Sequence, residues 1–390
     1  VPQGPRYPIR DARKSITISR PNRNNMEARG RIRTDGPDGM DGPGSIILGT
    51  DGIELRSEGG TVKVVSLRDI VNVGAMDHQI NLETILEGSI VLSMLGNRYE
   101  DLLRELHRSR NELFLRARLM QESIRRPGVR CQCQITGKMS PGYTGRAEVR
   151  LYSTALVIMP ENDRVRRVPY SDILNTSSAD ETLSFQTERG CSVLLSQLGR
   201  ELGPLHRDIN AAVHEISGSI QSLLIQLCPT LNSSQLISVS RLMAEGKAAR
   251  RGDVEAISKE LWDALQLRIA GMGLGDEYTY LDSICEKGSV RVGIKRGLGE
   301  ERSDYLWVIA PVIGNPEGGN AIVFEATSEE GEGRATYVFR ILPAKNLYSL
   351  PIDDIPSTAD RSTQEVVAAL MAINFRREPI YLSESDLAVP

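Results

Sequence analysis

Two short segments decide the fold of this chain: LGTDGIEL at residues 48–55 and LYSTALVI at residues 151–158. They lie 103 residues apart. The same offset relates two further pairs of segments: VSLRDI (65–70) with VPYSDI (168–173), and SIVLSMLG (89–96) with SVLLSQLG (192–199). About twenty identities accumulate at this offset over some ninety positions, without a gap. Self-similarity at a fixed spacing is the signature of a repeated structural unit. The sequence therefore predicts that residues 26 to about 117 form one unit and that a second copy follows.

Within each copy the spacing of the apolar residues changes once, from every second residue to the spacing of a helix. Apolar residues first alternate over short runs bounded by Gly, Asp and Asn, as Ile53 and Leu55 do in the first copy and Cys131, Cys133 and Ile135 in the second. This alternation indicates antiparallel strands that are buried on one face. Later apolar residues share one helical face: Leu102, Leu106 and Leu113 in the first copy, and Leu202, Leu205, Ile209, Val213 and Ile216 in the second. Each copy thus predicts six or seven strands followed by one amphipathic helix.

This order of elements resembles the pleckstrin-homology-like (PH/GRAM-like) superfamily. The residues that carry the resemblance are the turn at 50–52 and the strand ends V-x-x-x-D-I at 65–70 and 168–173. It covers about half of the chain. In that superfamily the helix plugs one open end of a bent sheet, so the resemblance implies that the apolar stripe of each helix is core and not a cofactor site.

The complete chain is predicted to be an α+β protein with two tandem PH-like units, each closed by a C-terminal helix, then a helical segment and a C-terminal α+β domain. The expected boundaries are a flexible basic arm at 1–25, repeat 1 at 26–120, repeat 2 at 127–218, the helical segment at 219–272 and the last domain at 276–390. The last domain has strands followed by a helix, so a third, divergent PH-like copy is one interpretation of it.

Composition indicates a soluble globular protein. The chain has 390 residues, of which 40% are hydrophobic and 25% charged, and its formal net charge is −4. It is long enough for several cores, and its sequence holds no apolar run of the roughly 18 residues that a membrane-spanning helix requires. The five cysteines are scattered and odd in number. They favour a reducing cytoplasm over a disulfide framework.

The sequence offers no convincing catalytic or metal-binding pattern. Cys131 and Cys133 are spaced for one face of a strand and are interpreted as core thiols, because zinc sites use pairs spaced by two to four residues. There is no P-loop and no nucleophile elbow, so we expect neither enzyme activity nor a cofactor. An enzyme would have its site between the helical segment and the C-terminal domain, with four candidate residues: Asp276, Glu277, Tyr278 and Arg340.

The first hairpin loop differs between the copies. Copy one carries Asp35, Asp38 and Asp41 among glycines, which hints at an ion site, although the EF-hand pattern is absent. In lipid-binding PH domains this loop supplies the Lys and Arg that hold inositol phosphates. Copy two has three such residues in or near the loop: Lys138, Arg146 and Arg150. The resemblance therefore implies phosphoinositide recognition as an alternative for the second repeat only.

A further alternative is nucleic-acid binding through clustered arginines. The basic arm carries Arg6, Arg10, Arg13, Lys14, Arg20 and Arg23, and the end of the first helix is followed by Arg116, Arg118, Arg125 and Arg126. Such clusters neutralise phosphates. However, only 5% of residues are aromatic and no stacking motif accompanies these arginines, so the sequence favours other partners.

We interpret the chain as a non-enzymatic adaptor or scaffold that binds protein partners through its PH-like units. Its layout resembles the archaeal chemotaxis adaptor CheF, in which PH/GRAM-like β-repeats precede helical segments and which couples a phosphorylated response regulator to the motility motor. The layout is also similar to the histone chaperone FACT in having tandem PH-like domains, although this chain lacks the long acidic tail expected there. Both resemblances imply protein binding.

Overall fold

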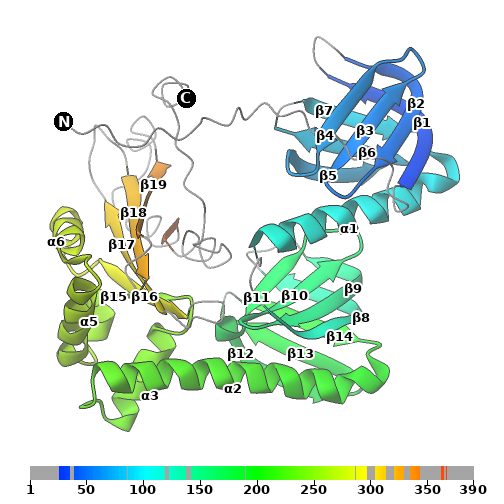
Figure 1. Cartoon of the computed structure of the whole chain (residues 1–390). Helices are drawn as coiled ribbons and strands as arrows, with labels where there is room; N and C mark the ends of the chain where they lie inside the picture. Colours follow the sequence, from blue (N-terminus) through cyan, green and yellow to red (C-terminus); the bar gives the residue numbers. More distant parts are fainter. Residues whose placement is uncertain are drawn as a thin grey trace, which may run out of the picture. The chain divides into compact units, whose positions relative to one another are not determined.

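The computed structural model of the chain is drawn in Figure 1. It describes residues 26–35, 39–85, 87–118, 123–137, 142–188, 190–285, 287–296, 304–312, 320–328 and 334–342, with residues 362, 363 and 366. The basic arm predicted at 1–25 lies outside the described residues. The chain divides into two compact units, Val1–Leu113 and Phe114–Pro390.

The first unit contains one antiparallel sheet and a helix (Figure 1). Its strands are β1 (Met26–Thr34), β2 (Asp41–Leu48), β3 (Gly52–Ser57), β4 (Val62–Ser66), β5 (Ile70–Met76), β6 (Gln79–Thr84) and β7 (Gly88–Ser93). Their order in the sheet is β4-β3-β2-β1-β7-β6-β5. A 3-10 turn, η1 (Gly96–Arg98), leads into α1 (Tyr99–Arg118). Leu102, Leu106 and Leu113 of α1 lie in the core of this sheet, as their spacing predicts.

The second unit begins with a copy of that architecture. Its strands are β8 (Ile124–Gly137), β9 (Tyr143–Tyr152), β10 (Ala155–Pro160), β11 (Arg166–Pro169), β12 (Ile173–Ala179), β13 (Thr182–Thr187) and β14 (Cys191–Ser196), in the order β11-β10-β9-β8-β14-β13-β12. The 3-10 turn η3 (Gly199–Glu201) leads into α2 (Leu202–Leu227), as η1 leads into α1. The predicted α+β class and the predicted repeat are both confirmed.

The two copies agree in register as well as in order. Strands β10, β12, β13 and β14 begin and end 103 residues after β3, β5, β6 and β7. A bulge follows Ile70 in β5, and the same bulge follows Ile173 in β12. The hairpin after each of these strands turns through two residues with positive φ, Asp77-His78 and Asp180-Glu181. Two such residues match the right-handed twist of a hairpin.

The rest of the second unit is a single core formed by helices and a third sheet. Its elements are the C-terminal half of α2, α3 (Ser233–Leu242), β15 (Ala248–Arg250), α4 (Arg251–Glu255), α5 (Lys259–Gly271), α6 (Gly275–Ile284), β16 (Arg291–Arg296), β17 (Asp304–Val312), β18 (Asn320–Ser328) and β19 (Arg334–Leu342). The strands follow one another in the order β15 to β19, which is not the order of the two repeats. Within the described residues, none of the helices is both long and apolar enough to cross a lipid bilayer.

Two features of this region were not expected from the sequence. Helix α2 continues without a break through residue 218, because Ile216, Ile220 and Leu224 extend its buried stripe. The strand β15 interrupts the helical segment and pairs with β16, Ala249 lying opposite Val292. These pairings place the helices and the C-terminal strands in one core.

Candidate functional site

The outward face of the first sheet is rich in arginine. Ala28, Gly30 and Ile32 of β1 point inward, so that Arg29 and Arg31 point to the other face. The strand register then gives the neighbours of these side chains. Arg29 lies opposite Ser45 of β2, which lies opposite Arg56 of β3. Because residues paired across antiparallel strands share a face, these side chains form one outward-facing set.

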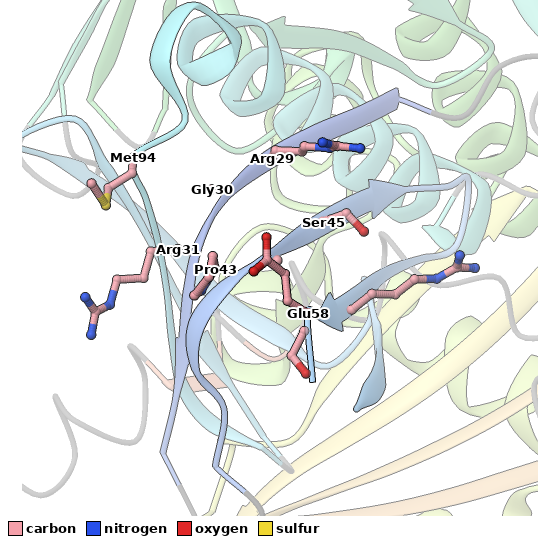
Figure 2. A pocket seen from close by; sticks show the side chains of 10 residues that line it. Arg29, Gly30, Arg31, Pro43, Ser45, Glu58 and Met94 are labelled. Carbon is pink, nitrogen blue, oxygen red and sulfur yellow. The ribbon is translucent and has the colours of Figure 1, made fainter. Parts of the chain in front are cut away.

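A groove with a cavity volume of about 750 Å³ lies on this face (Figure 2). Its lining consists of Arg29, Gly30, Arg31, Pro43, Gly44, Ser45, Arg56, Ser57, Glu58 and Met94. In Figure 2, Arg31 and Met94 lie towards one end of the groove and Arg29 towards the other, with Pro43 and Glu58 between them. The groove therefore presents guanidinium groups in two directions.

Two glycines in the lining explain why the strands approach so closely here. Gly30 and Gly44 are paired in register. A Cβ on Gly30 would lie 2.5 Å from the Ser93 carbonyl oxygen, and one on Gly44 would lie 2.3 Å from the Arg56 carbonyl oxygen. No real side chain tolerates such distances to backbone, so only glycine fits either position.

The arginines of the groove differ in their partners. Arg31 pairs with Asp41, with 2.9 Å between Nη2 and Oδ1, and both side chains are more than half exposed. Arg56 pairs with Glu54, and this hydrogen bond, with the attraction of the carboxylate, raises the pKa of Arg56 above its ordinary value. Among the residues that the structure describes, Arg29 has no ion-pair partner. One cation in the groove is therefore available to a ligand without breaking an internal pair.

Exposed apolar side chains border the same face. Val62 lies opposite Arg56 and Val64 opposite Glu54 in the register of β3 and β4. Val62 is 55% exposed and Met94 is 78% exposed. The face thus combines cations with apolar side chains, and Arg and Met are enriched in protein interfaces.

The predicted ion-site residues are spread along the β1–β2 hairpin. Asp41 is engaged by Arg31. Asp35 is exposed, and its backbone N–H donates to the Ser89 carbonyl oxygen at 3.0 Å. Asp38 lies outside the described residues. Across the described part of the chain, no cluster of three or more metal-ligating side chains occurs, so the ion site stays a prediction.

Two of the three predicted phosphate-binding residues of the second repeat, Arg146 and Arg150, lie on β9. Arg146 is exposed. Arg150 donates from Nε to Glu148 Oε1 at 2.6 Å, so its charge is already compensated. Lys138 lies outside the described residues. Of the two candidates within the described residues, Arg146 is the exposed cation.

The paired cysteines are core residues, as predicted. Cys131 is 7% exposed and Cys133 is 2% exposed, and both pack in the core of the second sheet. Burial raises the pKa of Cys131 to about 11 and that of Cys133 to about 12. Thiols with such values carry almost no thiolate at neutral pH and are poor nucleophiles and metal ligands.

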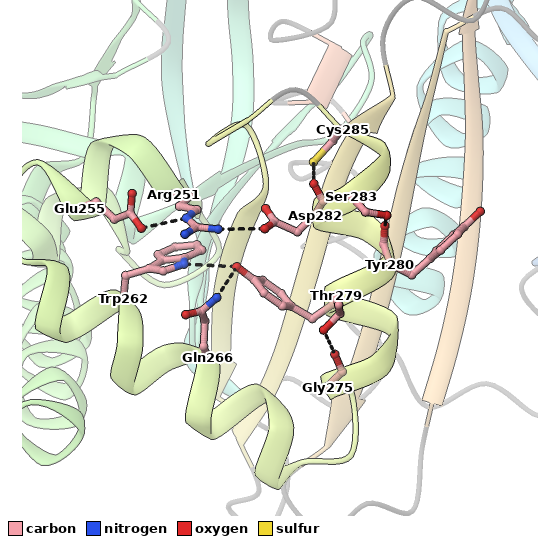
Figure 3. A network of polar contacts seen from close by, with 11 residues as sticks. Arg251, Glu255, Trp262, Gln266, Gly275, Thr279, Tyr280, Asp282, Ser283 and Cys285 are labelled. Carbon is pink, nitrogen blue, oxygen red and sulfur yellow. Dashed lines mark hydrogen bonds and ion pairs between the residues drawn. The ribbon is translucent and has the colours of Figure 1, made fainter.

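The region considered for an enzyme site contains a polar network (Figure 3). The Tyr278 hydroxyl accepts from Trp262 Nε1 at 3.2 Å and from Gln266 Nε2 at 3.0 Å. Nearby, Arg251 donates to Glu255 at 2.8 Å and to Asp282 at 2.9 Å. These bonds join α4, α5 and α6 to one another.

Of the four residues named for an enzyme, Tyr278 takes part in these bonds. Tyr278 belongs to the network, and burial raises its pKa. Asp276 and Glu277 lie in the first turn of α6, where negative charge favours a helix. Arg340 lies on β19 opposite Ala321. The bonds of Tyr278 to α5 and of Arg251 to α6 thus support a structural role for the network.

The groove on the first sheet was not identified from the sequence, although a signal for it exists. RGRIR at residues 29–33 places an arginine at every second position of a strand, and hence on one face. The offset of 103 residues assigns Gln132, Gln134 and Thr136 to the same positions of the second repeat. Comparing outward positions between the copies would have shown the difference in charge.

No protein-family model and no curated protein matches the chain. Among solved structures, the chain is similar to one described as "Structure of the Spt16D Pob3N heterodimer", with 17% sequence identity and a TM-score of 0.17. The similarity covers 42% of this chain and 83% of the other. The strand order and register of the two sheets define the fold.

Proposed function

We propose that this chain is a non-enzymatic adaptor that binds protein partners through its PH-like units. The observation that carries this proposal is the groove on the outer face of the first sheet. It is open, it is lined by three arginines, and exposed valines and a methionine border it. A surface that mixes Arg and Met with a small number of acids resembles a protein-binding surface more than a reaction centre.

Other features support an adaptor over an enzyme. The polar side chains around Arg251 and Tyr278 are bound to one another, and Cys131 and Cys133 are core thiols. The resemblance to the adaptor CheF is a further reason to propose an adaptor. All five cysteines are free, which is compatible with a cytoplasmic location.

The adaptor proposal is tested by isolating a complex and rebuilding it. The full chain would be captured from its own cells after mild cross-linking, and each candidate partner would then be purified and titrated with the full chain. We expect saturable binding of fixed stoichiometry by at least one purified protein, and no binding to vesicles that contain phosphoinositide.

Two results would overturn the adaptor proposal. One is that no purified candidate forms a saturable complex. The other is selective binding to phosphoinositide vesicles that is lost when Lys138→Ala and Arg146→Ala are combined, since this would identify a membrane-targeting module. Arg68→Ala is a matched loss of charge in the first repeat, where Arg68 is exposed in a turn, and it should leave vesicle binding unchanged.

A further inference from the structure

We infer that the groove of the first repeat binds an extended acidic segment of a protein partner, in which carboxylates alternate with apolar side chains. This inference rests on the proposed adaptor function and adds the place and the chemistry of recognition. The site consists of Arg29, Arg31 and Arg56 above the glycine pair Gly30 and Gly44.

The spacing of the arginines favours an extended ligand. Arg29 and Arg31 are two residues apart on β1, and residues two apart on a strand are separated by roughly 7 Å. A bound segment in strand conformation places every second side chain at the same interval. Alternate Asp or Glu residues of such a segment would therefore face Arg29 and Arg31 in turn.

The type of cation favours carboxylates. The groove contains arginine and no lysine among its lining residues. A guanidinium group presents paired donors that match a carboxylate in two parallel hydrogen bonds. Arg31 and Arg56 already make charge-assisted contacts with one carboxylate oxygen each, of Asp41 and Glu54. A bound carboxylate would replace these internal partners, and it would bind Arg29 without any replacement.

The surroundings of the groove argue against a nucleic acid. Glu58 lines the groove, and Glu54 and Glu27 lie in the adjacent row of the same face. A continuous chain of phosphates would be repelled by these acids, whereas a polypeptide can place neutral residues beside them. The lining holds no aromatic side chain, so bases would find no surface on which to stack.

The exposed apolar side chains beside the groove indicate that apolar residues alternate with the carboxylates in the ligand. Val62 is adjacent to Arg56 across β4 and β3, and Met94 follows Ser93, which lies opposite Arg31. Apolar side chains at both sides of the arginines would contact apolar residues of the ligand. This contact area distinguishes a protein segment from a simple polyanion.

The test uses the full chain and a nine-residue peptide, the length of β1. The fluorescein-labelled peptide alternates glutamate with valine and threonine, and a matched peptide has glutamine in place of every glutamate. Fluorescence anisotropy at low salt measures binding. We expect the glutamate peptide to bind at least about tenfold more tightly than the glutamine peptide, and its affinity to fall as salt is added.

Variants then locate the binding. Arg29→Gln should weaken the glutamate peptide by roughly two- to fivefold, in keeping with one exposed ion pair. The combination of Arg29→Gln, Arg31→Gln and Arg56→Gln should abolish the preference for glutamate. Arg68→Gln removes one charge outside the groove and should change the affinity by less than about twofold. Circular dichroism confirms that each variant is folded.

Three outcomes would overturn the inference. The two peptides could bind equally, the triple variant could bind as Arg68→Gln does, or single-stranded DNA or phosphoinositide vesicles could bind the groove more tightly with the same dependence on the arginines. If the peptide experiment fails while a purified partner still forms a complex, the adaptor function stands and the groove is not its site. If the peptide binds and no partner exists, the adaptor function fails instead.

Discussion

The outer faces of the two repeats differ in chemistry, whereas the inward positions of both stay apolar in the same register. On β3 of the first repeat, Glu54 and Arg56 form an ion pair on the outer face. The positions 103 residues later on β10 are Val157 and Met159, and both are buried. They pack with Tyr152 and with Leu115 from the last turn of α1, a turn that belongs to the second unit.

This comparison shows that the inward and outward residues of a strand can change independently. The inward residues of both copies keep the same register because a shift by one residue would expose the whole core. The outward residues are free to become either a solvated charged face or an apolar packing surface. A duplicated sheet can therefore offer one copy for binding while the outer face of the other is used for packing.

The largest expected effect comes from exchanging one outward residue between the copies. Val157→Glu gives the second repeat the residue of the first and buries a carboxylate without a partner. We expect it to cost about 3–5 kcal/mol of the free energy of unfolding. The opposite exchange, Glu54→Val, removes a pair in which the arginine side chain is 53% exposed and the glutamate side chain 14% exposed, and it should cost about 1 kcal/mol, less than Val157→Glu.

Denaturant unfolding of the full chain, followed by circular dichroism, measures both exchanges. Equal losses of stability in the two variants would contradict the difference between the outer faces. A loss of less than about 1 kcal/mol for Val157→Glu would show that this position is open to water.

The glycine pair of the groove provides the second contrast. Gly44 corresponds to Ala147 in the second repeat. Gly44→Ala would bring a methyl group to 2.3 Å from the Arg56 carbonyl oxygen, and overpacking of this kind costs about 1–3 kcal/mol. Ala147→Gly in the second repeat should cost only about 0.5–1 kcal/mol.

Thermal unfolding of the two glycine-site variants tests this contrast. The acidic peptide adds a second readout, because Gly44→Ala alters the groove and should weaken peptide binding, whereas Ala147→Gly should not. Unchanged stability and unchanged binding in Gly44→Ala would show that the close approach of the strands is unnecessary.

The core cysteines should make the free energy of unfolding of the second repeat decrease at alkaline pH, an effect that the first repeat lacks because it has no such cysteines. Cys131 and Cys133 occupy the positions of Ala28 and Gly30. Their pKa values are raised from 9.0 to about 11 and about 12. A raised pKa means that the unfolded chain loses these protons first, so the stability that they provide is present below pH 9 and decreases between about pH 9 and pH 12.

At pH 10 each thiol should have reduced the free energy of unfolding by about 1 kcal/mol relative to pH 8. Urea unfolding at pH 8, 9 and 10 measures this decrease. The variant with Cys131→Ala and Cys133→Ala should show a smaller decrease over the same range. The same slope in both proteins would mean that other groups cause it.

Much of the fold could be predicted because the repeat supplies two samples of one pattern. The boundaries of β3, β5, β6 and β7 recur in the second copy without adjustment, and Leu102, Leu106 and Leu113 lie in the core as their spacing predicts. The strand β15 could not be predicted, since three residues, Ala248–Arg250, carry too little periodicity to indicate a strand.

The candidate site was harder to predict than the fold. The sequence of the first hairpin loop and its neighbours predicts binding residues such as Asp41 and Arg150, which the structure shows in internal ion pairs. A groove depends on how strands pack, and the close approach at Gly30 and Gly44 involves backbone atoms of Ser93 on β7 and Arg56 on β3, which a single strand's sequence does not reveal. Alternation places Arg29 and Arg31 on one face, but it does not indicate that this face is hollow.

The smallest expected effect comes from moving the arginines to the second repeat. This experiment tests whether charge alone, without the shape of the groove, is enough for peptide binding. In a chain whose groove is neutralised by Arg29→Gln, Arg31→Gln and Arg56→Gln, the pair Gln132→Arg and Gln134→Arg restores arginines at the equivalent positions of the second repeat. The free energy of unfolding should change by less than about 0.5 kcal/mol, as for most surface substitutions.

Binding of the acidic peptide should not return in this chain. The second repeat has Cys133 and Ala147 where the first has its two glycines, and Met159 takes the place of Arg56. Met159 is also packed with Leu115, so it cannot serve as an exposed border of a groove. Anisotropy with the nine-residue peptide decides the point. Recovery of the parent affinity would mean that alternate arginines are sufficient on any outer face, and that the glycine-lined groove contributes nothing to recognition.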